Sequence, residues 1–416
     1  MEKKFVFISH RVIFERMKIL YIHQYFKTPA EGGSIRSYYL AKGLVDAGHQ
    51  VSMISAHDGA YDVKNVDGIE VHYLSVSYDN KFGFIKRLFS FWKFVILARN
   101  KALKLDKHDL AYVMTTPLTT GFIATYLKRK LDLSYYFEIG DLWPEAPISM
   151  GVIKNKFFKK WLYTVEKKFY FEADKVIALS PAIRNYVEKV CPKIKVYVIP
   201  NMSDCQFFEP EYSIGDYRYS NKFQMTYCGA IGRANHLEFL LAAARESARS
   251  RLPIHFNIIG YGSEMHRLQQ EARFLNNVTF YPHEGKDRVK KLLDQSDAVY
   301  VSFKDVDILG TGCPNKFFDA LAAGKLSVIN FNGWIKSVIE KNRCGFHHDP
   351  HHPKEFVRKI KVFLRSPELL LKYQRNGRKL AELYYDKQIQ ITKLLKILNN
   401  EYKCEKDKSE VYNLTA

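Results

Sequence analysis

The sequence of 416 residues contains no apolar run of about 18 residues, the length that a transmembrane helix needs, which argues against a membrane-spanning segment. Its basic N-terminus lacks the apolar core and the cleavage site of a signal peptide. The six cysteines are scattered and form no C-x-x-C pair, so we expect a chain of the reducing cytosol. A G-x-G-x-x-G fingerprint is also absent after the first strand-like run, which argues against a dehydrogenase.

Positive charge and aromatic rings are abundant instead. Lys and Arg number 64 against 44 Asp and Glu, a net charge of +20, and there are 27 Tyr and 29 Phe. Apolar residues make up 47% and charged residues 26%, which is ordinary for a globular protein and excludes disorder as a description of the whole chain. The combination indicates a partner that is anionic and partly apolar: nucleic acid, an acidic ligand or a membrane surface.

Short β-branched or aromatic runs alternate with amphipathic stretches, a pattern typical of parallel sheets built from βαβ units. The predicted strands are 18–22, 51–55, 110–114, 135–138, 175–178 and 196–199 in the first half, and 223–228, 254–259, 278–280, 298–302 and 326–330 in the second. Between these sets, a stretch rich in Asn, Ser, Asp, Pro and Gly predicts a linker. We therefore predict an α/β fold with two Rossmann-like, doubly wound domains that face each other across a ligand-binding cleft.

The expected domain boundaries follow from the same patterns. They are an N-terminal extension at 1–16, a first domain at 17–200, the linker at 201–222, a second domain at 223–383, and a C-terminal helix and tail at 384–416.

Each predicted domain has a glycine-containing loop between its first strand and its first helix, where free N–H groups can point at anionic oxygens. In the first domain this loop holds Gly32 and Gly33, although an ordinary helix-capping turn would use the same residues. In the second domain the loop holds Arg233, which either pairs with a phosphate or is a solvated surface arginine.

Two further loops of the second domain are expected at the carboxyl edge of its sheet. One contains Gly260 and Gly262, and the other contains Tyr281 and Pro282. Loops in these positions are suited to enclosing a nucleobase.

The tract at 311–325, TGCPNKFFDALAAGK, predicts a helix with an apolar and a polar side. Asn315, Lys316 and Asp319 share the polar side. A carboxylate at Asp319 can accept hydrogen bonds from two ribose hydroxyls, and Lys316 lies one turn closer to the phosphates of such a nucleotide.

This tract resembles the donor-site motif of retaining GT-B glycosyltransferases of family 4, E-x7-E followed by A-x-A-x-G-x-P. The Gly-Gly loop, G-x-x-G-R after the linker, I-I-G-x-G and Ile199-Pro200-Asn201 agree with that family in order and spacing, over about residues 18–400. The resemblance implies a C-terminal helix that crosses back to the first domain. It also implies transfer of a sugar, with retention of configuration and without a metal or other cofactor, from a nucleotide diphosphate donor that we expect to be UDP-linked.

A second tract, FEIGDLWPE at 137–145, is similar to transferases of the O-antigen, colanic-acid and capsule type, which act on N-acetylated amino sugars such as N-acetylfucosamine. The second Glu of the family motif is Asp319 here, and the first falls on Thr311. The usual His of the first domain falls on Gly140, so the nearest acids are Asp141 and Glu138.

By this resemblance, the catalytic candidates are Asp141, Glu138 and Thr311. Arg233, Lys316 and the helix N-termini would place positive charge where negative charge develops on the leaving diphosphate.

Two stretches of the first domain combine basic residues with aromatic ones, which is typical of a helix lying at a membrane surface. Residues 81–105 contain no acid, and 154–170 repeat the pattern. A buried helix with snorkelling lysines is the alternative. The residues that we expect at a membrane or at an acceptor are Lys86, Arg87, Trp92, Lys93, Lys159, Lys160 and Trp161.

These observations predict a peripheral enzyme on the inner face of the cell membrane, with a polyprenyl-diphosphate-linked saccharide as acceptor and no nucleic-acid partner. One rival is a UDP-sugar epimerase of the same fold, which has no need of the basic aromatic stretches. The other is a nucleic-acid-binding protein, which only the charge supports. The histidine-rich segment 347–352 is interpreted as a surface loop rather than a metal site.

Overall fold

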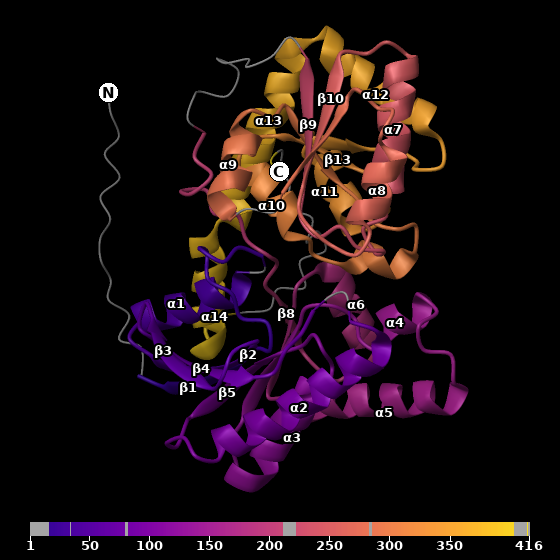
Figure 1. The fold of residues 1–416 in the computed structure, drawn as a ribbon. Coiled ribbons are helices and arrows are strands. Elements are labelled where there is room, and N and C mark those ends of the chain that lie inside the picture. The colour runs from indigo at the N-terminus through magenta and orange to yellow at the C-terminus, as the bar shows by residue number, and fades with distance from the viewer. Residues whose placement is uncertain are drawn as a thin grey trace, which may run out of the picture.

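A computed structural model of the chain describes residues 16–33, 35–79, 82–210, 222–282, 285–402 and 414. Figure 1 shows two domains, the N-terminal one below and the C-terminal one above, each with helices around a central sheet. Of the expected extension at 1–16, only Arg16 is among the described residues.

The N-terminal domain is built on an eight-stranded sheet with the strand order β3-β4-β2-β1-β5-β6-β7-β8. Neighbouring strands are parallel except β3 and β4, which pair in antiparallel fashion at one edge. The strands are β1 (Lys18–Ile22), β2 (Gln50–His57), β3 (Asp62–Val66), β4 (Ile69–Ser75), β5 (Leu110–Met114), β6 (Tyr135–Ile139), β7 (Lys175–Ala178) and β8 (Val196–Val198). The helices are α1 (Arg36–Asp46), α2 (Phe84–Ala102), α3 (Thr120–Leu131), α4 (Glu145–Ser149), α5 (Lys156–Glu172) and α6 (Pro181–Val190).

The C-terminal domain has a six-stranded parallel sheet with the order β11-β10-β9-β12-β13-β14. Its strands are β9 (Phe223–Cys228), β10 (Ile254–Ile259), β11 (Val278–Tyr281), β12 (Ala298–Val301), β13 (Leu326–Ile329) and β14 (Gly345–His347). The helices are α7 (Glu238–Arg249), α8 (Met265–Glu271), α9 (Lys286–Asp294), the 3₁₀ helix η1 (Asp307–Thr311), α10 (Asn315–Ala322), α11 (Trp334–Lys341), α12 (Pro353–Arg365) and α13 (Pro367–Leu380).

Both sheets confirm the prediction of two Rossmann-like, doubly wound domains. The strand order reverses beside the first strand of each domain, between β1 and β5 and between β9 and β12. Ligands in such folds bind at the carboxyl ends of the strands beside this switch point. The strands could be found in the sequence because parallel strands that are buried on both faces are continuous apolar runs. In β5 and β6, for example, every residue is buried.

The hairpin of β3 and β4 is missing from the predicted strands. The sequence of β3, DVKNV, is polar, and none of its residues is buried, so it carries no apolar alternation. The Asp67-Gly68 turn, with φ angles of 52° and 88°, is the signal that could have indicated it.

The C-terminal helix crosses back to the N-terminal domain, as the resemblance implies. After α13, a π-helical segment η2 (Ala381–Tyr385) leads into α14 (Lys387–Leu398), which lies against α1 in Figure 1. The two helices approach closely at Gly43 of α1, where an added Cβ would lie 2.4 Å from Cγ2 of Ile391. Lys175 of β7 also donates a hydrogen bond of 2.6 Å to Asn400, just beyond α14.

None of the helices within the described ranges combines the length and the apolar character that a bilayer crossing requires.

We expect Gly43→Ala to lower the free energy of unfolding by about 1–3 kcal/mol, because the new methyl group would overlap Ile391 at the packed contact of α1 with α14. The loss would oppose the gain of up to about 1 kcal/mol that alanine normally gives inside a helix. Urea denaturation measures the change.

The matched control is Gly377→Ala in α13, where a Cβ would meet Leu321 and Cys344 at ordinary contact distances of 3.4 and 3.6 Å. This variant should equal or exceed the wild type in stability. A Gly43→Ala variant as stable as Gly377→Ala would contradict the described seating of α14.

Candidate active site

A buried ion pair lies at the base of the interdomain face of the N-terminal domain. Nε of Arg36, the first residue of α1, is 2.9 Å from Oε1 of Glu138 on β6, and Nη2 is 3.0 Å from Oε2. The same guanidinium donates to the backbone carbonyls of Ile199 and Pro200, at 2.8 and 2.6 Å. Tyr112 donates a further hydrogen bond to Glu138.

This arrangement corrects the expectation that Glu138 is catalytic. Its side chain is fully buried, and its two oxygens are occupied by Arg36 and Tyr112. A carboxylate held in this way holds the fold together and is closed to a substrate.

Asp141, the other acidic candidate, follows β6 and has the opposite surroundings. It is exposed, yet the protein around it raises the pKa of its carboxyl by desolvation. The hydroxyl of Thr116 interacts with the carboxylate and opposes this shift. An accessible acid with a raised pKa is typical of a functional site.

The glycine loop of the N-terminal domain faces the C-terminal domain. Gly32 and Gly33 have φ angles of 69° and 89°, in the left-handed region that other residues avoid. A Cβ on Gly32 would lie 4.0 Å from the backbone nitrogen of Lys286 at the start of α9, whereas a Cβ on Gly33 would meet nothing within 4 Å. The loop therefore lies beside the N-terminal end of a helix from the other domain.

The other predicted glycines, Gly260 and Gly262, have a packing role. A Cβ on Gly260 would lie 1.8 Å from the carbonyl oxygen of Gly229, and a Cβ on Gly262 would lie 2.2 Å from that of Ile231. The loops after β9 and β10 are thus pressed together, and their neighbour rather than a ligand excludes a side chain. The expectation that this loop helps to enclose a nucleobase stays a prediction.

Lys316 of α10 is held beside the loop that follows β9. Its Nζ donates to the hydroxyl of Tyr227 at 2.8 Å and to Oδ1 of Asn235 at 3.0 Å, and it lies close to Gly229. Burial lowers the pKa of Lys316 to about 8. The ammonium group is therefore preorganised next to backbone that a phosphate could approach.

Asp319 lies one turn further along α10. No described residue donates a hydrogen bond to its carboxylate, and burial raises its pKa to about 6. Lys286 opposes this shift and Asp204 reinforces it, which places all three charges within electrostatic range. A half-buried carboxylate without a described donor is suited to accept ligand hydroxyls.

A cluster of charges around Asp204 joins the two domains. The carboxylate of Asp204 accepts from Lys286 of α9 at 3.3 Å, from Lys387 of α14 at 2.7 Å and from the hydroxyl of Tyr39 on α1. Burial alone would raise the pKa of Asp204, but the two lysines, together with the hydrogen bond from Tyr39, lower it to about 2. The cluster links the N-terminal domain, the start of the linker, the C-terminal domain and the crossing helix.

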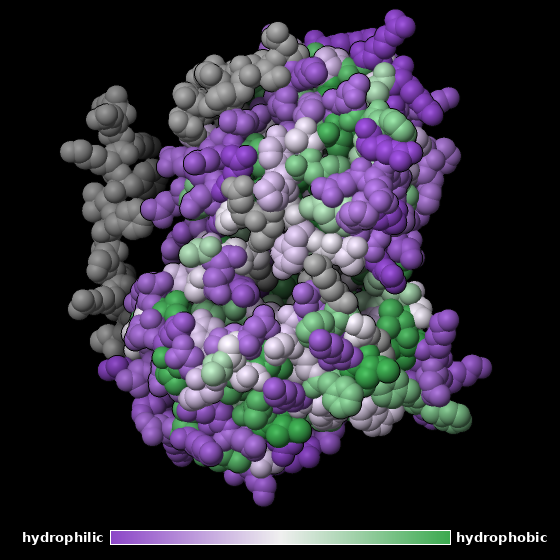
Figure 2. Space-filling model, viewed as in Figure 1, coloured by the Kyte–Doolittle hydropathy of each residue, from purple (hydrophilic) through white to green (hydrophobic). Residues whose placement is uncertain are grey.

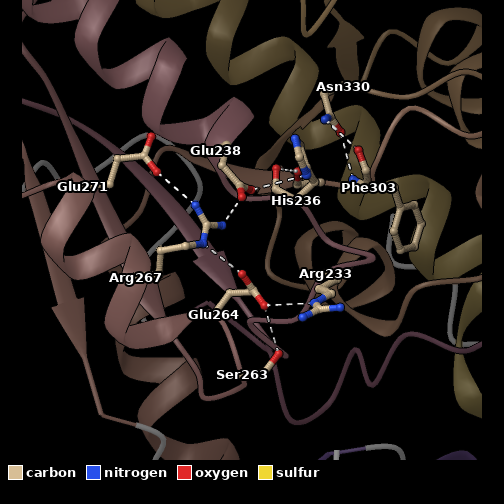
Figure 3. Close-up of polar contacts among 10 residues, drawn as sticks. Arg233, His236, Glu238, Ser263, Glu264, Arg267, Glu271, Phe303 and Asn330 are labelled. Carbon is tan, nitrogen blue, oxygen red and sulfur yellow. Dashed lines mark hydrogen bonds and ion pairs between the residues drawn. The ribbon is translucent and has the colours of Figure 1, made fainter. Parts of the chain in front are cut away.

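Arg233 extends from the loop after β9, as Figure 3 shows, with 87% of its side chain exposed. Its Nε is 3.5 Å from Oε1 of Glu264. Behind it, three carboxylates, those of Glu238, Glu264 and Glu271, hold Arg267. An exposed ion pair at this distance is weak, so Arg233 can exchange it for a phosphate at small cost.

The remaining donor-side candidates are less engaged or differently engaged. The hydroxyl of Thr311 donates to the carbonyl of Ile308 within η1, at 2.7 Å, so it already has a local partner. Asn315 is partly exposed at the start of α10. Tyr281 donates to Asn257 at 3.3 Å and is partly buried, and Pro282 is exposed.

Direct contacts bring the start of α10 against the N-terminal domain. Ser180 donates to the carbonyl of Thr311 at 2.6 Å, and the backbone nitrogen of Asn201 donates to Sγ of Cys313 at 3.2 Å. Asp141 acts electrostatically on the buried thiol of Cys313. The acid of one domain and the donor-side helix of the other therefore lie at the same interface.

The basic aromatic stretches form a second surface, on the N-terminal domain. Trp92 of α2, Phe122 of α3, and Trp161 and Phe158 of α5 stand in a row with ring centroids 5.2, 6.3 and 5.5 Å apart, which we call the aromatic row. Further exposed apolar side chains on α2 and α5, or just before α5, are Ile85, Phe89, Ile96, Val152, Phe157 and Phe171. Figure 2 shows hydrophobic surface where Figure 1 places these helices.

The predicted cations of this surface lie on the helices α2 and α5, which also carry the two tryptophans of the aromatic row. Lys86, Lys93 and Lys160 are exposed, and Lys159 is partly exposed. Arg87 is partly buried and donates to the carbonyl of Phe82. The other face of α2 packs in the core through Phe91, Phe94, Val95 and Ala98. The helix is thus apolar on two sides, of which only one is buried.

Histidines of the segment 347–352 pair with nearby polar side chains. His351 lies 2.9 Å from Asp305, and His352 lies 2.8 Å from Asp349. His348 is buried against the hydroxyl of Tyr300. The described part of the chain contains no group of three or more His, Cys, Asp or Glu side chains arranged to hold a metal ion.

Three residues of the interface are absent from the sequence-based candidates: Arg36, Thr116 and Lys286. The Thr-Thr-Pro sequence directly after a predicted strand was the available signal for Thr116. Neither Arg36 nor Lys286 stands in a pattern that distinguishes it from a surface cation, and only their partners from distant segments reveal them.

Comparisons with known proteins identify the two domains. The Glycosyl transferase 4-like domain matches residues 31–202, and the Glycosyl transferases group 1 domain matches 215–380. An uncharacterised glycosyltransferase of Methanocaldococcus jannaschii is 23% identical over 291 residues, which cover 66% of this chain and 71% of that protein.

Solved structures share the fold over nearly the whole chain. Sucrose-phosphate synthase of Thermosynechococcus elongatus gives a TM-score of 0.76 at 16% identity, over 92% of this chain and 99% of that one. Anabaena Alr3699/HepE in complex with UDP-glucose gives a TM-score of 0.67 at 16% identity, over 92% of this chain and 100% of that one.

The protein is therefore a glycosyltransferase with the GT-B fold. More narrowly, its N-terminal half is similar to the Glycosyl transferase 4-like domain and its C-terminal half to the Glycosyl transferases group 1 domain.

Substitutions distinguish the roles of Glu138 and Asp141. We expect Glu138→Gln to cost about 3–5 kcal/mol of unfolding free energy, because it leaves the buried charge of Arg36 without its partner. Asp141→Asn should keep the wild-type stability or exceed it, since the fold disfavours the ionised form of Asp141, and should lower turnover.

Urea denaturation and a transferase assay of both variants measure the two effects. A stable but inactive Glu138→Gln protein would return Glu138 to the catalytic candidates. An Asp141→Asn protein with wild-type turnover would remove Asp141 from them.

Proposed function

We propose that this glycosyltransferase transfers a sugar, with retention of configuration, from a UDP-linked donor to a polyprenyl-diphosphate-linked saccharide at the cytoplasmic face of the cell membrane. The transferred sugar is an N-acetylated amino sugar, and the product belongs to a bacterial surface polysaccharide such as O-antigen or capsule. The carrying observation is that Thr311 and Cys313, which lead into α10 with its Lys316 and Asp319, contact the N-terminal domain, where Asp141 acts electrostatically on Cys313.

The donor half of the proposal rests on the chemistry of the C-terminal domain. Lys316, beside the loop after β9, and Arg233, within that loop, supply positive charge, which suits a diphosphate. Asp319 supplies acceptor oxygens for ribose hydroxyls. The structural similarity to HepE, which was solved with UDP-glucose, supports a nucleotide sugar as donor. With these cations in place, we propose a reaction without a metal cofactor.

The acceptor half rests on the N-terminal domain. Asp141 is the acid that we assign to the hydroxyl of the acceptor, because it is exposed at the interface while Glu138 is enclosed. The aromatic row and its lysines, on the same domain, fit a membrane surface that presents a lipid-linked acceptor. The preference for N-acetylated amino sugars rests on the similarity of the 137–145 tract to polysaccharide transferases.

A donor screen that detects nucleotide release tests the proposal, with a polyprenyl-diphosphate-linked saccharide as acceptor. We expect release to depend on both the UDP-sugar and the lipid-linked acceptor. Epimerisation of the UDP-sugar without any acceptor would overturn the transferase assignment in favour of an epimerase of the same fold.

The donor KM should depend on the protonation of Asp319. Its pKa is raised to about 6, so the ionised form that accepts ribose hydroxyls is present at pH 7 and is lost as the pH falls through about 6. We expect the donor KM to rise by up to about tenfold per pH unit below this value. Asp319→Asn should have a raised donor KM that does not change between about pH 5 and 7, because asparagine does not titrate.

Arg233→Ala is the companion variant. It should raise the donor KM or abolish turnover without changing stability, because its ion pair to Glu264 is exposed and weak. Steady-state kinetics with varied donor, together with thermal denaturation, provide both readouts. Wild-type kinetics in Asp319→Ala and Arg233→Ala would remove the assigned donor site.

Membrane binding should depend on the exposed aromatic side chains. We expect the double variant Phe89→Ser and Phe157→Ser, at positions 72% and 87% exposed, to reduce flotation with anionic vesicles about tenfold or more, because each phenyl ring contributes apolar area to the bilayer interface. Phe274→Ser is the matched control, since Phe274 is 80% exposed on the C-terminal domain.

The control should float like the wild type, and the salt dependence should report the lysines. Equal loss in both proteins, or tight oligonucleotide binding without vesicle binding, would contradict the membrane assignment.

A further inference from the structure

Thr116 has a backbone conformation that threonine rarely adopts. Its φ angle is +83°, in the left-handed region, where a β-branched side chain is sterically strained. Glycine would adopt this conformation easily, yet position 116 carries a threonine side chain. Residues held in such conformations cluster at functional sites, where the surrounding structure maintains them.

The position of this residue coincides with the switch point of the N-terminal sheet. Thr116 follows β5, which pairs with β1. The strand order reverses between these two strands. The carboxyl ends of strands at such a point form the ligand crevice of doubly wound folds. Asp141 follows β6, which is the next strand beside β5.

Two threonines join the ends of these neighbouring strands. The backbone nitrogen of Gly140 donates to Oγ1 of Thr115 at 3.0 Å, and a Cβ on Gly140 would lie 3.7 Å from Oγ1 of Thr116. Thr115 is buried and Thr116 is partly exposed. Thr115 thus fixes the backbone of the Gly140–Asp141 turn, while the hydroxyl of Thr116 is left to act on the carboxylate of Asp141.

We propose that Thr116 is a positioning residue for the transfer reaction: its strained backbone holds the hydroxyl against Asp141 and orients that carboxylate toward the hydroxyl of the acceptor. The proposal rests on the proposed function, in which Asp141 contacts the acceptor. It accounts for a threonine where glycine would be easier to accommodate, since glycine has no hydroxyl to offer.

The groups around Asp141 determine how its ionisation can be read. Cys313 faces it from the C-terminal domain, and burial raises the pKa of that thiol to about 12, so it stays neutral. Glu138, on the strand that precedes Asp141, is enclosed in its buried ion pair with Arg36 of α1. Asp319 titrates near pH 6, but it acts on the donor. The acid limb measured with varied acceptor at saturating donor therefore reports Asp141.

Four variants test the proposal: Thr116→Ser, Thr116→Val, Thr116→Gly and, as a control, Thr115→Val. Thr116→Val keeps the shape but lacks the hydroxyl, so we expect kcat to fall roughly 10- to 100-fold with an unchanged donor KM. Its acid limb should move to higher pH, because the hydroxyl favours the charged form of Asp141. Thr116→Ser should restore both values.

Thr116→Gly should melt at a higher temperature than the wild type, because it relieves the strain, and should lose activity like the valine variant. Thr115→Val should lose stability with no shift of the acid limb, since it removes only the hydrogen bond from Gly140. A wild-type pH profile in Thr116→Val, an active Thr116→Gly, or a Thr116→Ser as impaired as the valine variant would each overturn the proposal.

These outcomes are distinct from a failure of the proposed function. If the wild-type protein transfers no sugar in the donor screen, the proposed reaction is wrong. If the wild type is active and the Thr116 variants match it, only the positioning role is wrong. The melting temperature of Thr116→Gly reports the strain in either case.

Discussion

The bidentate ion pair of Arg36 with Glu138 is the interaction on which the interdomain face depends. Burial of both charges is tolerable because each of the three guanidinium nitrogens donates to an acceptor, including the carbonyls of Ile199 and Pro200. Through this one group, the start of α1, the end of β6 and the start of the linker are fixed together. The glycine loop before α1, Asp141 after β6 and the Asn201 contact to Cys313 are each within a few residues of it.

A second charged group, the cluster around Asp204, transmits this arrangement to the C-terminal domain. Lys286 contacts Asp204 directly and also stabilises the ionised form of Asp319. The orientation of the domains and the charge of the assigned donor carboxylate are therefore coupled through one lysine. A movement that separates Lys286 from Tyr39 and Asp204 would change the electrostatic surroundings of Asp319 at the same time.

Sequence reasoning succeeded where the structure follows local patterns. The strands β1 and β9 could be bounded because both are short runs rich in apolar residues and almost entirely buried. Lys316 and Asp319 could be placed on one side of α10 by helical spacing. It failed where a residue is defined by a distant partner. Nothing near Glu138 in the sequence reveals Arg36, 102 residues away, and nothing near Gly260 reveals that the loop after β9 fills its space.

Burial shifts the pKa values of Lys316 and Asp319 in opposite directions. Burial lowers the pKa of the lysine to about 8 and raises that of the aspartate to about 6. Both groups are therefore mostly charged at pH 7, but each pKa lies only about one unit from that pH. A diphosphate would favour the ammonium form of Lys316, and ribose hydroxyls that donate to Asp319 would favour its carboxylate. Donor binding would therefore strengthen both charges, and departure of the nucleotide would weaken them again. Two desolvated charges of opposite sign on one helix thus favour a ligand that carries both complementary groups over one that carries either alone.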